Sequence, residues 1–272
     1  MPPAVHRGAA TPIARAGTNQ RPFRGISHAK PSFSQATRGF IGTFAFVFIG
    51  AGAAAVVGDG AGLNGIAAIA FAHGLTIMVF AFAYGSLSGA HMNPAVTIGV
   101  LAAGAIRLRD VLGYIVIQLA GGIAGALLLR AVLGGVATGL GTPQLAHGLV
   151  LGAATVTITP TAGFVIEAVL AFFLVTIVLS TAVAGRARSL APLAIGMTLT
   201  LNIMMGGALT GAPFNPARAL GPMVATGNFT DAWLYMIAPV VGAVIAAFVH
   251  LGLTRLAREQ RMISQTAASP AE

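Results

Sequence analysis

The chain has 272 residues with a formal net charge of +9, and 56% of its residues are hydrophobic while only 8% are charged. Soluble domains carry about 25% charged residues, so this composition and the mean hydropathy of +0.87 exclude a soluble protein and indicate one that lies in lipid. The absence of cysteine excludes disulfides, thiolate metal sites and cysteine nucleophiles.

The first element is a basic leader, residues 1–37, that contains no acidic residue. It has no apolar core of seven or more residues, so it does not have the pattern of a secretory signal. We predict a disordered cytoplasmic tail with some attraction to anionic lipid.

Six apolar stretches follow, each long enough to cross about 30 Å of hydrocarbon as a helix. Backbone groups in lipid must be paired within a span, and the stretches lack the alternation of barrel strands, so helices are expected. The predicted spans are 39–57, 65–83, 111–133, 163–184, 190–209 and 233–253.

The basic residues are distributed as the positive-inside rule requires rather than in a nucleic-acid-binding patch. With six spans, thirteen of the fifteen fall on one side of the membrane, and only Arg130 and Arg218 fall in the opposite half. Both termini are therefore predicted to be cytoplasmic, in an integral multi-pass protein of the plasma membrane.

The chain also contains an internal repeat. A shift of 122 positions superimposes Asn93-Pro94-Ala95 on Asn215-Pro216-Ala217, together with several glycines on either side. Three spans per copy is an odd number, so the second copy must insert upside down. We predict an all-α polytopic membrane protein with an inverted three-plus-three repeat: a channel domain at 38–254, with repeats at 38–133 and 163–254, and a cytoplasmic tail at 255–272.

Each Asn-Pro-Ala tripeptide has the pattern of a helix start, because asparagine is a preferred N-cap and proline suits the first helical position. The segments that follow, 96–106 and 218–227, are too short to cross a membrane, so they are predicted to be half-helices. Their positive dipole ends would converge at the bilayer centre and disfavour cations and protons. The amides of Asn93 and Asn215 would orient a passing water molecule and so oppose proton hopping.

The stretches Ser88 to Thr97 and Asn215 to Arg218 resemble the signature loops of the aquaporin, or major intrinsic protein, family. The resemblance covers about residues 39–253. It implies six spanning helices with two half-helices, a pore through each protomer, and a homotetramer.

In that family, selectivity is assigned to a constriction on the outer side of the tripeptides. Counting from the tripeptides places His73, Ile203, Ala212 and Arg218 at its four positions. Water-selective members typically carry an aromatic residue at the first of these and a histidine at the second, so this set is more similar to vacuolar-type and ammonia-permeable members. The resemblance therefore implies passage of water with small neutral solutes, ammonia foremost, then hydrogen peroxide or urea.

The family pattern also implies that Glu167 braces the first pore loop by bonding to His91 and to that loop's backbone. The equivalent positions of a second brace hold Gly39 and Pro213, so both members of that brace are expected to be missing.

Three other functions, a glycerol channel, a coupled transporter and an enzyme, fit the sequence less well. A glycerol channel of the same family usually has an aspartate where Ala219 stands. A coupled transporter needs carboxylates at the midplane, where only Glu167 qualifies. An enzyme needs a nucleophile and base, or a cluster of metal ligands, and the sequence has no such pattern. We expect no catalytic residue, cofactor, metal or nucleic-acid partner; the expected partners are water, small uncharged solutes and the lipid bilayer.

Overall fold

A computed structural model describes residues 33–58 and 62–268; the predicted leader lies outside this range except for its last residues. The α-helices are α1 (Phe33–Ala45), α2 (Gly52–Val57), α3 (Gly62–Ser88), α4 (Pro94–Ala102), α5 (Leu108–Val132), α6 (Pro160–Val178), α7 (Ala191–Thr210), α8 (Pro216–Thr226) and α9 (Ala232–Ala268). A π-helical turn, η1 (Phe46–Ala51), joins α1 to α2 into one continuous span, and another, η4 (Leu179–Val183), ends α6.

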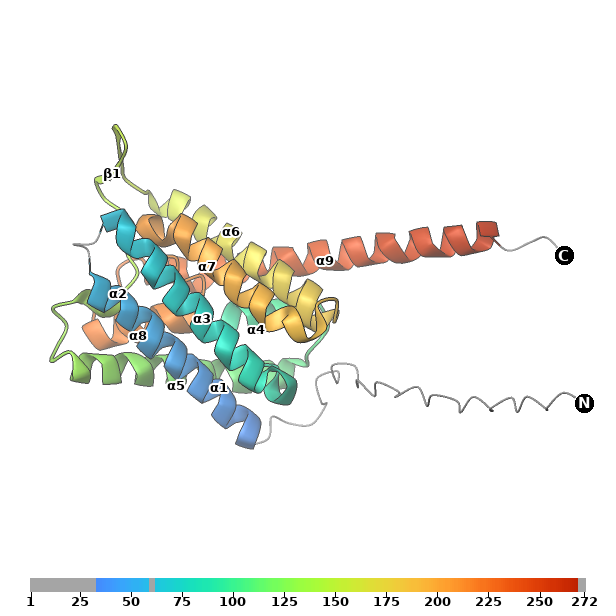
Figure 1. Ribbon diagram of the computed structural model, residues 1–272, viewed down its shortest axis with the longest axis horizontal. Helices are drawn as coiled ribbons and strands as arrows, with labels where there is room; N and C mark the ends of the chain where they lie inside the picture. Colours follow the sequence, from blue (N-terminus) through green and yellow to red (C-terminus); the bar gives the residue numbers. More distant parts are fainter. Residues whose placement is uncertain (1–32, 59–61, 269–272) are drawn as a thin grey trace, which may run out of the picture.

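Six helices in the described part of the chain are long and apolar enough to cross a membrane, which confirms the predicted spans. They cover Gln35–Val57, Gly65–Gly85, Leu108–Val132, Pro160–Val183, Arg188–Thr210 and Ala232–Gln265. The last helix is longer than expected, because α9 continues to Ala268 through the segment predicted only as a tail. Figure 1 shows this helix projecting well beyond the bundle.

The two short helices after the tripeptides, α4 and α8, lie inside the bundle. Figure 1 places α4 in the half of the molecule from which α9 projects and α8 in the opposite half. The two half-helices therefore enter from opposite faces, as an inverted repeat requires.

Backbone geometry supports the duplication. Gly89 and Gly211 both adopt left-handed φ angles, 73° and 77°, and the alanines that follow them, Ala90 and Ala212, have φ angles of 46° and 40°. Alanine rarely adopts positive φ, so the same strained turn has been kept before each tripeptide.

The two repeats meet where α3 crosses α7. A methyl group added at Gly74 would lie 2.6 Å from the carbonyl oxygen of Gly196, and one added at Gly196 would lie 2.6 Å from the carbonyl oxygen of Gly74. The two glycines are equivalent under the 122-residue shift, so this reciprocal contact places them beside the pseudo-two-fold axis. Small residues allow such close backbone approach, which drives helix association in lipid.

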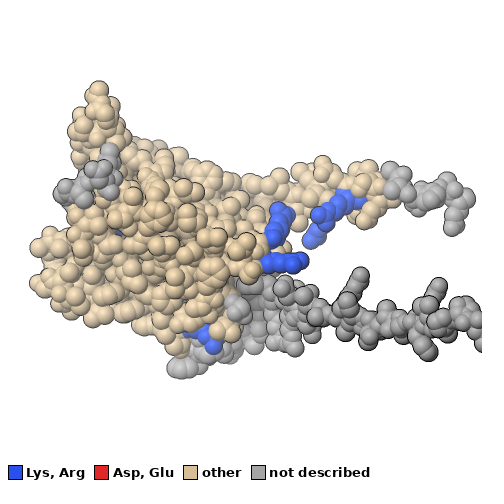
Figure 2. Space-filling view, viewed as in Figure 1, with Lys and Arg blue, Asp and Glu red and all other residues tan. Residues whose placement is uncertain are grey.

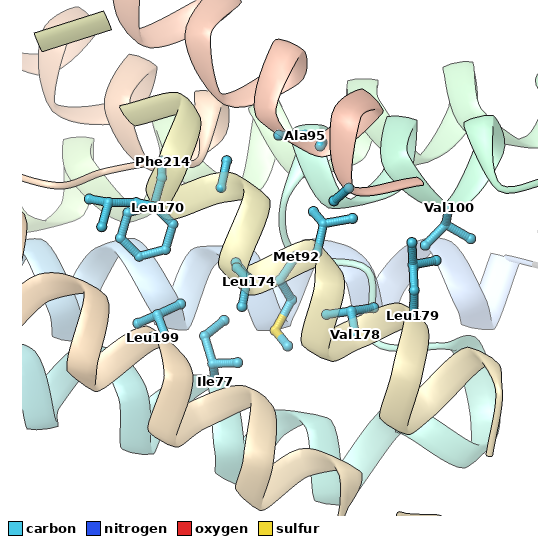
Figure 3. Close-up of a cluster of buried hydrophobic side chains, with 14 of the residues drawn as sticks. Ile77, Met92, Ala95, Val100, Leu170, Leu174, Val178, Leu179, Leu199 and Phe214 are labelled. Atoms are coloured by element: carbon cyan, nitrogen blue, oxygen red, sulfur yellow. The ribbon is translucent and has the colours of Figure 1, made fainter. Parts of the chain in front are cut away.

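Apolar side chains fill the interior and also cover the outside of the bundle. In the interior, Leu170, Leu174 and Val178 of α6 pack against Ile77 of α3 and Leu199 of α7 (Figure 3). Many large apolar side chains on the outward faces are exposed, among them Val116, Leu201 and Phe248. This exposed apolar surface is what a lipid environment requires, since lipid tails are as apolar as the side chains.

Charge and loops distinguish the two ends of the molecule. Basic side chains gather at the end from which α9 projects (Figure 2). At the other end, the connector between the repeats forms a hairpin of β1 (Leu149–Leu151) and β2 (Ala154–Val156), antiparallel and paired from Leu149 with Val156 to Leu151 with Ala154.

Candidate functional site

The two tripeptides form N-caps as predicted from the sequence. The Oδ1 atom of Asn93 accepts from the backbone N–H of Ala95 at 2.9 Å, and that of Asn215 accepts from the N–H of Ala217 at 3.0 Å. Both asparagines have extended backbone, and in each case a proline takes the first helical position. Each side chain therefore turns inward to pair donors that the start of a helix would otherwise leave free.

The same two side chains also link the loops to each other. Asn93 donates from Nδ2 to the carbonyl oxygen of Phe214 at 3.0 Å, and Asn215 donates from Nδ2 to the carbonyl oxygen of Met92 at 2.9 Å. Met92 and Phe214 are equivalent under the repeat, so the two bonds are symmetric. The structure thus brings both tripeptides together at one point in the bundle.

Glu167 corrects one of our predictions, because it holds the second loop and not the first. It is fully buried, and its carboxylate accepts from Thr210 Oγ1 at 2.6 Å and from the backbone N–H of Phe214 at 2.7 Å. The predicted partner, His91, bonds elsewhere. The second loop is therefore braced although position 213 holds a proline. The brace uses the backbone N–H of Phe214, which does not depend on the side chain at position 213.

Tyr235 completes the support of the second loop. Its hydroxyl donates to the carbonyl oxygen of Thr210 at 2.9 Å, and Thr210 Oγ1 accepts from the N–H of Ala212 at 3.1 Å. Sequence analysis did not identify either residue. The sequence does offer a signal for each: Thr210 directly precedes the Gly211-Ala212 turn, and Tyr235 places a hydroxyl in an apolar span.

The first loop is held by uncharged groups. His91 stacks on Tyr114 and its Nδ1 lies 3.0 Å from Thr97 Oγ1. Gln118 donates from Nε2 to the same hydroxyl at 2.9 Å, and Thr97 Oγ1 donates to the carbonyl oxygen of Asn93 at 3.0 Å. Gly39 faces the carbonyl oxygen of His91. A carboxylate at position 39, which the family pattern expects and this chain lacks, would therefore lie against the first loop and not the second. The sequence signal for this network is a glutamine within an apolar span, Gln118, which the family pattern did not point to.

We expect Thr97→Val to loosen this first loop. The change removes the hydroxyl that joins α4 to His91 and accepts from Gln118 Nε2. Gln118 would then lose the acceptor for its Nε2, in addition to having no partner for its Oε1 among the described residues. An unpaired buried polar group costs about 1–3 kcal/mol, and thermal unfolding in detergent would measure the loss. Thr198→Val is the control, because within the described part of the chain that hydroxyl bonds to the carbonyl of Ala194 in its own helix and joins no second element. Equal stability of the two variants would contradict the network.

Arg218 and His73 meet on one side of the loops. Arg218 Nε donates to His73 Nε2 at 3.3 Å, and its NH1 donates to the carbonyl oxygen of Gly141 at 2.7 Å. His73 Nδ1 lies 2.8 Å from the carbonyl oxygen of Ile69, which can only accept. The histidine therefore carries its hydrogen on Nδ1, and its ring is neutral. The role of Gly141, a backbone acceptor at the end of a short 3-10 helix, η3 (Gly139–Gly141), had no sequence signal.

The other two predicted filter residues, Ile203 of α7 and Ala212 of the second loop, belong to one apolar cluster and have exposed fractions of 3% and 2%. His73 and Arg218 are similarly enclosed, at 1% and 3%. The described residues contain no group of three or more histidine, cysteine, aspartate or glutamate side chains that could hold a metal ion.

In the described part of the chain, six helices long enough to span a membrane surround two capped half-helices whose N-termini meet inside the bundle, as in a membrane channel protein. The family model for the major intrinsic protein matches residues 27–250. Aquaporin TIP4-1 of Zea mays is 38% identical over 220 residues, which cover 78% of this chain and 82% of that protein. Aquaporin NIP1-3 of Oryza sativa subsp. japonica is 31% identical over 256 residues, 94% of this chain and 84% of that protein.

A solved structure shows the same fold. The aquaglyceroporin from Plasmodium falciparum superimposes with a TM-score of 0.67 at 24% identity, over 78% of this chain and 93% of that one. The chain belongs to the major intrinsic protein family and is an integral multi-pass channel for water and small solutes. It is thus grouped with channels and not with enzymes.

Proposed function

We propose that this channel passes water together with small neutral solutes, ammonia foremost, then hydrogen peroxide or urea, and excludes protons and ions. The observation that carries the proposal is the composition of the constriction. In the proposed constriction, the bonded His73–Arg218 pair would supply the polar side, and Ile203 and Ala212, which belong to a buried apolar cluster, would supply the apolar side. An opening that is polar on one side and apolar on the other accepts a small neutral solute that loses part of its hydration.

The pore centre supports proton exclusion. Each side-chain amide of Asn93 and Asn215 uses one hydrogen for the bond to the opposite loop and has a second that can face the pore. A water molecule that accepts from both amides turns its own hydrogens toward its neighbours on either side, which interrupts proton hopping. The N-termini of α4 and α8 add a positive potential equivalent to about half a charge each. Both effects act at Asn93-Pro94-Ala95 and Asn215-Pro216-Ala217.

Arg218 supports the exclusion of cations. Its guanidinium is anchored through Nε and NH1, which fixes its orientation, and the remaining N–H groups can donate to a polar solute. Its charge is nearly buried, so it repels cations through a medium that screens poorly.

We also propose that residues 38–254 form the channel domain, that both termini are cytoplasmic, and that the protein works as a homotetramer in the plasma membrane. Support for the orientation comes from the basic side chains at the end from which α9 projects (Figure 2). Protease protection of tagged termini in sealed cells tests the topology, and cross-linking in intact membranes tests the assembly.

Stopped-flow measurements on reconstituted vesicles test the solute proposal. Water permeability and ammonia uptake should both exceed those of protein-free vesicles, and glycerol uptake should be the slowest. High water flux with ammonia uptake no faster than in protein-free vesicles would overturn the proposal for ammonia.

His73→Phe should narrow the constriction and shift selectivity toward water. Phenylalanine is larger than histidine and cannot accept from Arg218 Nε, so the opening loses both width and a polar group. We expect ammonia permeability to fall by roughly tenfold, which corresponds to about 1.4 kcal/mol of barrier, with a smaller change for water. His147→Phe is the control, since His147 is exposed in the outer connector. A ratio of ammonia to water permeability that is the same in both variants would contradict the assignment of His73.

A further inference from the structure

Gly50 lies directly behind the histidine of the constriction. A methyl group built at Gly50 would lie 2.5 Å from His73 Cδ2, 2.7 Å from Nε2 and 2.8 Å from Cγ. Carbon atoms in favourable contact are about 3.5–4.0 Å apart, so the imidazole occupies the space that any larger residue at position 50 would need. The ring rests on the backbone of the first span.

The other contacts of His73 leave it little freedom to move. Nδ1 is bonded to the carbonyl oxygen of Ile69, Nε2 is bonded to Arg218, and the edge of Phe46 meets the ring with centroids 5.4 Å apart and planes at 79°. Phe46 and Gly50 both belong to η1, the π-helical turn that interrupts the first span. Such turns widen a helix locally and are frequent at functional sites.

We propose that Gly50 is a positioning residue that sets the selectivity of the pore. Because it has no side chain, His73 can sit back against η1, and the constriction keeps its width. A side chain at position 50 would displace the ring by about 1 Å, and with it Nε2, the atom that accepts from Arg218. This inference rests on the proposed role of His73 in the constriction, and it adds a residue of the first span, behind His73, to the four residues already proposed to set selectivity.

The test is Gly50→Ala in reconstituted vesicles. We expect ammonia permeability to fall by roughly tenfold relative to the unmodified protein, equivalent to about 1.4 kcal/mol of barrier, while water permeability falls less. Gly52→Ala is the matched control: it is two residues away in the same span, and its added methyl would meet only the end of the Leu129 side chain, at 3.3 Å. That variant should keep the original ratio of ammonia to water permeability.

A double-mutant cycle shows whether Gly50 acts through His73. His73→Ala removes the ring that the added methyl would displace, so Gly50→Ala should have no further effect on the ratio in that background. If Gly50→Ala alone gives little folded protein, His73→Ala should restore the yield, because it removes the ring with which the added methyl clashes. Failure of that rescue, or equal effects of Gly50→Ala with and without the imidazole, would overturn the proposal.

The proposed function can fail separately. If the unmodified channel conducts water but no ammonia, the solute proposal is wrong, and the cycle is then measured on water permeability alone. A decrease in water permeability for Gly50→Ala that disappears in the His73→Ala background would still support Gly50. An unchanged water permeability would overturn it.

Discussion

Replacing Glu167 by leucine should abolish water conduction. The carboxylate accepts from Thr210 Oγ1 and from the N–H of Phe214, and leucine offers neither donor an acceptor. Each buried donor without a partner costs about 1–3 kcal/mol, so the second loop should leave its position and carry Arg218 with it. Water permeability near that of protein-free vesicles, together with a lower unfolding temperature in detergent, is the expected result.

Two variants sharpen this test. Glu167→Gln retains an amide oxygen that can accept from Phe214, so its effect should lie between those of the wild type and the leucine variant. Glu259→Leu is the matched control, because Glu259 is an exposed residue paired with Arg255, and exposed pairs contribute about 0–1 kcal/mol. Normal water conduction in the Glu167→Leu protein would show that the loop does not depend on this carboxylate.

Changing Asn93 to aspartate should separate the two loops and weaken the barrier to protons. The side chain keeps an oxygen to cap α4, but a second oxygen replaces Nδ2 and faces the carbonyl oxygen of Phe214 across 3.0 Å. Loss of the bond should cost about 1–3 kcal/mol. A negative charge at this point would also offset the positive ends of the half-helices, each equivalent to about half a charge. A pH-sensitive dye inside vesicles should report faster proton entry.

Asn202→Asp distinguishes a pore effect from general damage. Asn202 is also buried and donates from Nδ2 to the carbonyl oxygen of Leu170 at 2.8 Å, so the substitution creates the same clash of two acceptors within the helices. It should lower stability to a similar degree without a proton leak. A proton leak of equal size in both aspartate variants would argue against the pore centre as the barrier.

The parts of the fold set by local chemistry could be predicted from the sequence. Spans follow from apolar length, and the caps of Asn93 and Asn215 follow from the preference of asparagine and proline for the first positions of a helix. The inverted arrangement followed from an odd number of spans per repeat. The family resemblance placed His73 and Arg218 in one filter, and the structure shows the two side chains in contact although 145 positions separate them.

The bracing of the loops could not be predicted in the same way. Glu167 bonds to a backbone N–H, and every residue except proline offers one, so the sequence does not mark Phe214 as the partner. The family pattern had matched the glutamate to His91 and to the backbone of the first loop, and it did not point to the second loop. The hydroxyl of Thr97, which holds the first loop, was hidden for a similar reason: threonine within a membrane helix usually bonds to its own backbone.

The length of α9 was underestimated because hydropathy reports the end of the membrane and not the end of the helix. Apolar character falls after Leu253, yet the following residues are good helix formers, and Arg255 pairs with Glu259 one turn later at 2.9 Å.

The mutual bonds between the tripeptide loops also affect how the protein is made. Asn93 leaves the ribosome 121 residues before its acceptor, Phe214. At about 5–20 residues per second, translation leaves the first half without that acceptor for roughly 6–24 s. During this interval the Asn93 amide lacks the acceptor that it has in the finished protein, so any partner for it must come from its own half of the chain, from water, from lipid headgroups or from the insertion machinery.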